Sequence, residues 1–209
     1  MTIRFHLAAT LASAVTASTQ LAAQARTPVP SQVLVDAAVR KAATEHKAVL
    51  VKFGASWCGW CSRFDAFLAD TGVGPIMAAN YVTVGLITEE APANKALENP
   101  GSEALLKAMG GAASGLPFFV VVDSTGRRIA DSNIMPGGSN VGHPDLPEEV
   151  AAFDQFLVRT APRMMPAERA RIRAYLDQIA GRSHTAPTRE RRGSEVVPGV
   201  CGWRAVARR

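Results

Sequence analysis

The sequence contains few cysteines and only a short apolar stretch near its start. Three of the 209 residues are cysteine, and none precedes Cys58. Three cysteines are too few for a small fold stapled by disulfides. The lack of a cysteine before residue 58 excludes a lipid-modified cysteine at an N-terminal cleavage point. The apolar stretch at residues 7–15 is too short for a comfortable membrane span.

The motifs of several large enzyme classes are also absent. The sequence has no Gly-x-Gly-x-x-Gly, no Walker loop, no Gly-x-Ser-x-Gly and no paired-carboxylate arrangement. These patterns would have indicated dinucleotide binding, phosphate binding, a serine nucleophile or general acid–base work by two carboxylates. We therefore expect no cofactor other than a redox-active disulfide, and no metal.

An excess of positive charge is missing from the central part of the chain. The net charge is +5, but residues 26–181 carry 15 Lys and Arg against 16 Asp and Glu. The surplus comes from Arg4 and from seven arginines in residues 182–209. A near-neutral globular part argues against a fold that binds nucleic acid.

The sequence divides into four segments. Residues 1–25 are typical of a secretory signal peptide, because Arg4 provides a positive start and Ala23-Gln24-Ala25 offers a small-x-small cleavage site. The alternative is a disordered or weakly helical N-terminus. Residues 26–30 form a linker, residues 31–181 a folded domain with a C-terminal helical extension, and residues 182–209 a basic disordered tail. Export predicts a periplasmic or secreted protein without stable membrane insertion after cleavage.

The two cysteines that follow the first apolar strand pattern carry the chemistry. Cys58 and Cys61 are three residues apart at the start of a helical pattern, so both lie on one side of the first turn and can form a disulfide. A helix N-terminus favours an anion there, and the thiolate is the reactive form of cysteine. Thiol–disulfide exchange is the leading hypothesis. A purely structural disulfide and half of a metal site are the alternatives, with His143 and Cys201 as loose further ligands.

The order of predicted elements indicates an α/β domain. Helix 31–46, with Ser31 as its N-cap, precedes strand 48–54, and the CxxC helix follows. Residues 91–101 form a polar connection, and residues 132–147 form a loop long enough to be functional or mobile. The further elements are helix 76–80, strand 81–87, helix 102–109, strand 118–122, a hairpin strand at 127–131, helix 148–160 and helix 166–179.

Two segments resemble the thioredoxin family. Residues 48–63, AVLVKFGASWCGWCSR, are similar to the thioredoxin active-site strand and loop, and residues 115–123, GLPFFVVVD, are similar to the cis-proline segment. The resemblance covers roughly residues 31–160 and is strongest to exported bacterial thioredoxin-like proteins. It implies a thioredoxin-like fold, in which a central mixed sheet is flanked by helices, here with an added C-terminal helix.

The resemblance implies a role for each matching residue. Cys58 would attack and Cys61 would resolve, while Pro117 would be cis and pack beside the sulfurs. The backbone of Leu116 would pair with an extended substrate, and Trp57 would shield the disulfide. Trp57 and Trp60 are both expected either on a docking surface or in the core. The partners would be protein dithiols or disulfides, and an upstream redox partner is compatible with this scheme.

Two residues depart from the family pattern. Thioredoxins carry a buried Asp, which helps to move the resolving thiol's proton, where this chain has Lys52. We expect the Lys52 stem to lie along the strand with its ammonium in water; the alternative is a buried lysine that loses its charge. Gly59-Trp60 replaces the family's Gly-Pro between the cysteines, and these residues help to tune the redox potential.

The remaining candidates have ordinary expectations. His46 is expected at a helix end, His143 as a turn residue rather than an active-site neighbour, and Cys201 as an unpaired surface thiol in the tail. The basic face of the last helix, made of Arg169, Arg171 and Arg173, is expected to be solvated.

Overall fold

The computed structural model describes residues 27–185, with side chains to residue 180. Its strands are β1 (Ala48–Gly54), β2 (Tyr81–Ile87), β3 (Phe118–Val122) and β4 (Arg128–Asp131). Its helices are α1 (Ser31–Glu45), α2 (Gly59–Ala69), α3 (Gly74–Asn80), α4 (Ser102–Ala108), α5 (Pro147–Thr160) and α6 (Pro166–Thr185), with short 3₁₀ helices η1 (Pro92–Leu97) and η2 (Pro136–Gly138). Each predicted strand and helix is present, with ends that differ by a few residues at most, apart from the longer α6.

A single mixed sheet forms the centre of the domain. The strand order is β2-β1-β3-β4, with β1 parallel to β2 and antiparallel to β3, and with β4 returning antiparallel to β3. Strand β1 is central because its residues are apolar on both faces, whereas β2 and β4 are edge strands with exposed positions. The predicted mixed sheet flanked by helices is confirmed.

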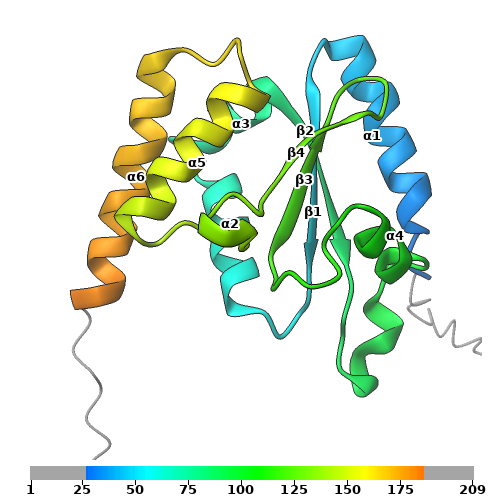
Figure 1. The fold of residues 1–209 in the computed structure, drawn as a ribbon. Coiled ribbons are helices and arrows are strands. Elements are labelled where there is room, and N and C mark those ends of the chain that lie inside the picture. The colour runs from blue at the N-terminus through cyan, green and yellow to red at the C-terminus, as the bar shows by residue number, and fades with distance from the viewer. Residues whose placement is uncertain (1–26, 186–209) are drawn as a thin grey trace, which may run out of the picture.

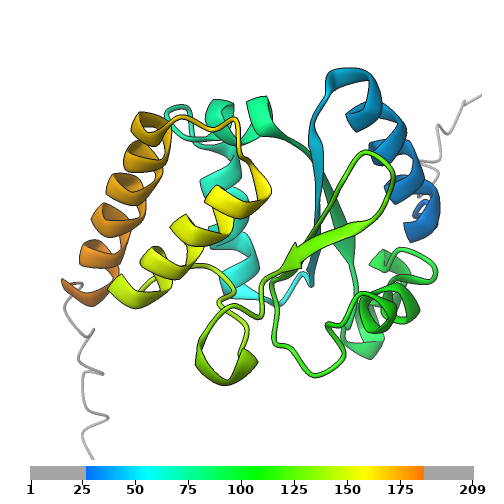
Figure 2. The same ribbon diagram turned by 45° about the horizontal axis from the view of Figure 1, so that its top comes forward.

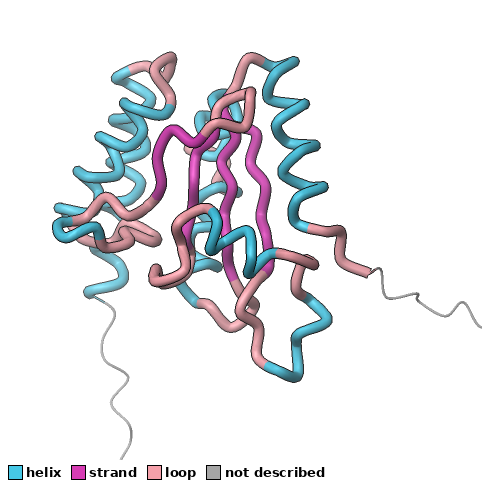
Figure 3. Tube along the Cα trace, turned by 45° about the vertical axis from the view of Figure 1, so that its right-hand side comes forward, coloured by secondary structure: helices cyan, strands magenta, loops and turns pink. Residues whose placement is uncertain are grey.

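Helices cover both faces of the sheet (Figures 1 and 3). Alternation along β1 sends Val49, Val51 and Phe53 into a core with α1 and α4, and sends Leu50 into a second core with α2, α3, α5 and α6. Lys52 has the same parity as Leu50, so it points toward the face that carries α2. This arrangement therefore places α2, the CxxC helix, over Lys52.

The C-terminal helices lie side by side beyond α2 (Figure 2). Arg169 and Arg173 of α6 both pair with Asp154 of α5, with nitrogen–oxygen distances of 3.4 and 2.7 Å. Arg171 donates to the carbonyl of Gly72. The prediction of a solvated basic face was therefore wrong for Arg169 and Arg173, because α5 presents a carboxylate to them, whereas Arg171 is exposed as predicted.

Three other predictions need correction. Ser31 is the first helical residue and Pro30 the N-cap, because the Ser31 hydroxyl donates instead to the carbonyl of Pro100. The connection at 91–101 contains η1. Helix α6 continues through Thr185, so the predicted boundary at 182 falls inside it.

Some predictions concern residues that the structure does not describe. The signal peptide at 1–25, the tail beyond Thr185 and Cys201 lie outside residues 27–185. Within the described part of the chain, no helix is both long and apolar enough to span a membrane.

Candidate functional site at the carboxyl end of strand β1

Cys58 and Cys61 form a disulfide at the start of α2. Their Cα atoms are 5.2 Å apart. Cys58 is the N-cap of α2, and its Sγ accepts a hydrogen bond from the backbone N–H of Cys61 at 3.1 Å. This is the position at which an N-cap side chain normally satisfies a free backbone donor. A thiolate at Cys58 would receive the same hydrogen bond and face the positive end of the helix dipole.

Both sulfur-bearing residues are largely covered by protein. Cys58 is 5% exposed and Cys61 3% exposed. The start of α2 lies at the surface, but the disulfide-bonded Cys58 is buried there.

A buried carboxylate holds the loop that precedes Cys58. Glu90 is 4% exposed, and its two oxygens accept hydrogen bonds from the backbone N–H and the hydroxyl of Ser56. The indole N–H of Trp57 donates to the carbonyl of Glu89 at 2.8 Å. The segment after β2 therefore fixes the approach to the active-site helix. This contact was not predictable from the sequence, because Glu90 is one charged residue in a polar stretch.

The two tryptophans beside the cysteines lie at the surface. Trp57 is 60% exposed and Trp60 45% exposed. The guanidinium of Arg63 lies 4.5 Å from the Trp60 ring centroid, in a cation–π contact. Of the two expectations for Trp60, a surface position is correct and a core position is wrong.

The Leu116–Pro117 peptide bond is cis. Phe118, the next residue, pairs with Phe53 at the carboxyl end of β1. The cis-proline segment and the CxxC loop therefore meet at the same edge of the sheet. Leu116 and Trp60 line one cavity of about 620 Å³ there.

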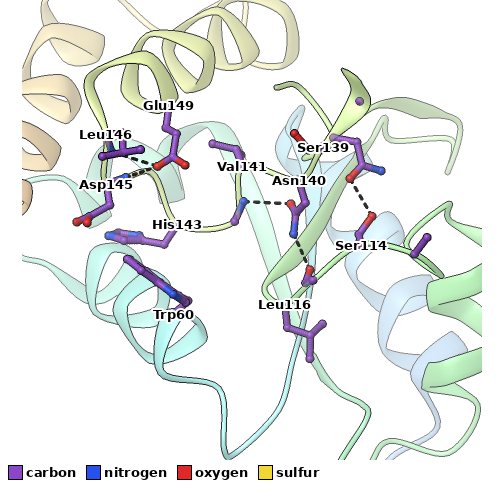
Figure 4. Close-up of a pocket in the computed structure, with 15 residues that line it drawn as sticks. Trp60, Ser114, Leu116, Ser139, Asn140, Val141, His143, Asp145, Leu146 and Glu149 are labelled. Carbon is purple, nitrogen blue, oxygen red and sulfur yellow. Dashed lines mark hydrogen bonds between the residues drawn. The ribbon is translucent and has the colours of Figure 1, made fainter. Parts of the chain in front are cut away.

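The loop at 132–147 forms the other wall of this cavity (Figure 4). The Asn140 side-chain amide donates to the carbonyls of Gly115 and Pro117, the latter at 3.0 Å. At the start of α5, the Glu149 carboxylate accepts the N–H groups of Asp145 and Leu146. These contacts give the loop a defined conformation that supports the cis-proline segment.

His143 contacts the active-site helix, contrary to the turn-residue expectation. It is 3% exposed, and its ring lies 6.3 Å from Trp60, 6.1 Å from Phe64 and 6.5 Å from Phe67, measured between centroids. Within the described part of the chain neither ring nitrogen has a hydrogen-bond partner. Burial lowers the pKa of His143 to about 4, opposed by the nearby Asp145 and assisted by Arg63. His143 is therefore a neutral, apolar-packed ring at neutral pH.

Lys52 is buried and ion-paired. It is 7% exposed, and its ammonium pairs with the carboxylate of Asp65 on α2. The expectation of an ammonium in water was therefore wrong. Asp65 was missed because only the folded structure places the fourth residue after Cys61 over β1, although its i+4 spacing from Cys61 is visible in the sequence.

No cluster of metal ligands occurs among the described side chains. Between residues 27 and 180 no three or more His, Cys, Asp or Glu residues are grouped so that they could hold a metal ion.

His46 lies at a helix end, as expected. It caps the C-terminus of α1 with a left-handed backbone, φ 54°.

Two solved structures are similar to part of this chain. A disulphide isomerase from Xylella fastidiosa Temecula1 has 19% identity over 71% of this chain and 89% of its own, with a TM-score of 0.43. The C-terminal domain of Neisseria meningitidis DsbD, in its oxidised form, has 29% identity over 50% of this chain and 84% of its own, with a TM-score of 0.35. No curated protein matches the chain at a significant level.

The family is identified by sequence. The model named Thioredox_DsbH, described as "Protein of unknown function, DUF255", matches residues 11–176, well over half of the chain. The match spans the mixed sheet, the Cys58–Cys61 pair and the loop at 132–147. The chain therefore belongs to the Thioredox_DsbH family and is a thioredoxin-like protein.

Proposed function

We propose that the protein is an exported thiol–disulfide oxidoreductase that exchanges disulfides with protein substrates through Cys58 and Cys61. The observation that carries this proposal is the hydrogen bond from the Cys61 N–H to the Cys58 Sγ at the N-terminus of α2. It would stabilise a thiolate at Cys58 and so select the attacking residue. Membership of a thioredoxin-like family is consistent with this chemistry.

The exchange has two steps. In the reduced protein, the Cys58 thiolate attacks one sulfur of a substrate disulfide, forming a mixed disulfide and releasing the other substrate sulfur as a thiolate. Cys61 then loses its proton and attacks the Cys58 Sγ. The Cys58–Cys61 disulfide forms, the second substrate thiol leaves, and the substrate has gained two electrons from the cysteine pair. Both steps can run in reverse on a substrate dithiol.

Four residues would bind the substrate. Trp57 and Trp60 offer exposed aromatic surface on either side of the start of α2. The backbone of Leu116, before the cis bond to Pro117, would pair with an extended substrate segment. Aromatic residues supply large contact area at low entropic cost, which suits a surface that binds many sequences.

Export is the part of the proposal that rests on residues 1–25. Expression of the full chain in a bacterium, followed by fractionation and N-terminal mass analysis, tests it. A periplasmic product that begins at Arg26 supports export, and a full-length cytoplasmic product contradicts it.

Reduction of insulin disulfides by dithiothreitol tests the activity. The wild type is expected to accelerate reduction, and Cys58→Ser is expected to abolish the acceleration. Cys61→Ser is expected to accumulate a mixed disulfide with the substrate. Equal rates for wild type and Cys58→Ser would overturn the proposal.

A binding module with a structural disulfide is the alternative function. This alternative was suggested by Lys52, which stands where thioredoxins carry a buried Asp. The pairing of Lys52 with Asp65 weakens the suggestion, because it brings a carboxylate to this region. It predicts a reduction potential below about −300 mV, as for structural disulfides. A readily reducible pair would count against it.

A further inference from the structure

The proposed exchange does not identify the group that accepts the proton of Cys61. A thiol must lose its proton before it can attack a mixed disulfide. Cys61 is 3% exposed, so bulk water reaches it poorly from the substrate side. A proton acceptor near Cys61, or a path that leads to one, is therefore needed.

A second cavity borders Cys61. It has a volume of about 360 Å³ and is lined by residues of β1, β2 and α2: Lys52, Gly54, Ala55, Ser56, Cys61, Ser62, Asp65, Gly85, Leu86 and Ile87. A water molecule occupies about 30 Å³ of liquid, so this space can hold several. Trp60 and Leu116 do not line it, so it is separate from the cavity beside the cis-proline segment.

Two glycines keep this cavity open. Gly85 pairs with Lys52 across the β1–β2 ladder, and a Cβ at Gly85 would meet nothing within 4 Å. A Cβ at Gly54 would lie 3.2 Å from the Cys61 Sγ and 3.8 Å from the Lys52 Cε. The Cys61 sulfur and the end of the Lys52 side chain thus flank the same small space.

The charged groups around this cavity are complementary. Among its lining residues, Lys52 and Asp65 carry charge, and Cys61 is the third titratable group. The Lys52 side chain is 9% exposed and that of Asp65 58% exposed. A buried ammonium requires a partner, so Lys52 draws the Asp65 carboxylate to the cavity. An ammonium has no free electron pair, whereas an ionised carboxylate can accept a proton.

We infer that Asp65, held by Lys52 at the water-accessible cavity behind the disulfide, accepts the proton of Cys61 during release of the substrate. This inference rests on the proposed exchange reaction. The proton moves from the Cys61 Sγ through water to an Asp65 oxygen. The Cys61 thiolate then forms the bond to Cys58 as the Cys58–substrate bond breaks. The departing substrate thiolate takes up the proton from Asp65 or solvent, so charge and protons balance. Lys52 is a positioning residue.

A single-turnover experiment tests this assignment. Reduced protein is mixed with insulin, quenched with acid, alkylated, and scored for the mixed disulfide at several pH values. For Asp65→Asn we expect normal formation of the mixed disulfide. Its decay at neutral pH should be at least about tenfold slower, because general base catalysis typically contributes about 100-fold or more to a rate. The deficit is expected to shrink as the pH approaches the ordinary thiol pKa of about 8.5.

Four further variants separate the chemistry from a structural effect. Asp65→Glu keeps the carboxylate and should restore most of the rate. Gly85→Leu fills the cavity without altering a charge and should slow the same step. Lys52→Met should slow it less than Asp65→Asn does, because the acceptor remains but is no longer held. Asp36→Asn, an exposed acid on α1, is the control for loss of one charge and should have no effect.

Several results would overturn the inference. One is a rate of mixed-disulfide decay in Asp65→Asn that equals the wild-type rate. Another is a slower rate in Asp65→Asn whose deficit is the same at every pH. A third is slow decay in Lys52→Met with normal decay in Asp65→Asn. If Cys61→Ser, which cannot resolve the intermediate, forms no mixed disulfide with insulin, the proposed function itself fails, and this inference fails with it. The two failures are therefore distinguishable.

Discussion

The backbone N–H of Cys61 donates a hydrogen bond to the Sγ of Cys58, across 3.1 Å at the first turn of α2. The donor belongs to the main chain, so it persists whatever side chain residue 61 carries. The two cysteines are thereby made unequal: one sulfur caps the helix, and the other lies above Lys52 and Gly54.

Trp60 is expected to contribute to protein substrates but not to the chemical step. Its exposed ring can be covered by a polypeptide, and loss of a contact residue typically costs about 1–2 kcal/mol, which is roughly a 5- to 30-fold higher KM. Trp60→Ala should therefore raise KM for insulin and leave turnover of a small disulfide such as hydroxyethyl disulfide nearly unchanged. Met165→Ala, which removes an exposed side chain just before α6, is the control and should alter neither. Equal losses on both substrates would contradict a docking role.

His143 is expected to make the stability depend on pH. Its pKa is about 4 in the folded protein and near 6.5 when unfolded. Between these values the unfolded chain binds more protons, so the free energy of unfolding falls as the pH is lowered from 6.5 through 4, by up to about 3 kcal/mol at 1.36 kcal/mol per pKa unit. His143→Phe should be neutral or stabilising at pH 7, because the ring packs among aromatics. It should also flatten the dependence between pH 4 and 6.5. His46→Asn, at an exposed histidine, is the control; a steep dependence that survives His143→Phe would contradict the assignment.

Glu90 is expected to stabilise the loop before Cys58. Replacement by Gln leaves only one acceptor oxygen for the two donors of Ser56 and removes the charge from the buried acceptor, and a hydrogen bond to a charged group contributes about 1.5–3 kcal/mol. Urea unfolding of Glu90→Gln should show a loss of this size. Glu89→Gln, at the exposed neighbour, should stay within about 0.5 kcal/mol of wild type. Equal stability of the two variants would show that the Ser56 contacts contribute little.

Asp154 is expected to attach α6 to α5. Its side chain is 14% exposed and faces both Arg169 and Arg173. Asp154→Asn leaves two guanidinium groups without their carboxylate and should cost about 1–3 kcal/mol of unfolding free energy. Asp177→Asn, at an exposed position on α6, should be close to neutral. A cost for both variants would indicate a general charge effect rather than this contact.

The fold was predictable because its signals are local. The alternation and apolar runs of β1 and β3, the turn residues at 123–126 and the period of α5 each determine an element without knowledge of the others. Ser31 was misassigned as a cap because its hydroxyl has a long-range acceptor, the carbonyl of Pro100. A capping preference describes isolated helices and does not include such partners.

The candidate site was predictable only in part. The pair of cysteines is a contiguous motif that its spacing identified, whereas Leu116-Pro117 was identified by its resemblance to the thioredoxin cis-proline segment. The groups that surround the pair come from elsewhere in the chain: Glu90 follows β2, and His143 lies in the loop before α5. The exposure of Lys52 was predicted wrongly because its partner, Asp65, reaches it only once α2 packs on β1. Pairings of this kind are properties of the tertiary structure.

The most direct test of the account is the pH dependence of Cys58 alkylation. Reduced Cys61→Ser protein is treated with iodoacetamide across a pH series, and a short peptide with the same WCGWS sequence is the control. We expect Cys58 to react with a midpoint well below the ordinary thiol pKa of about 8.5, because the helix start stabilises its thiolate. A midpoint equal to that of the peptide would contradict it.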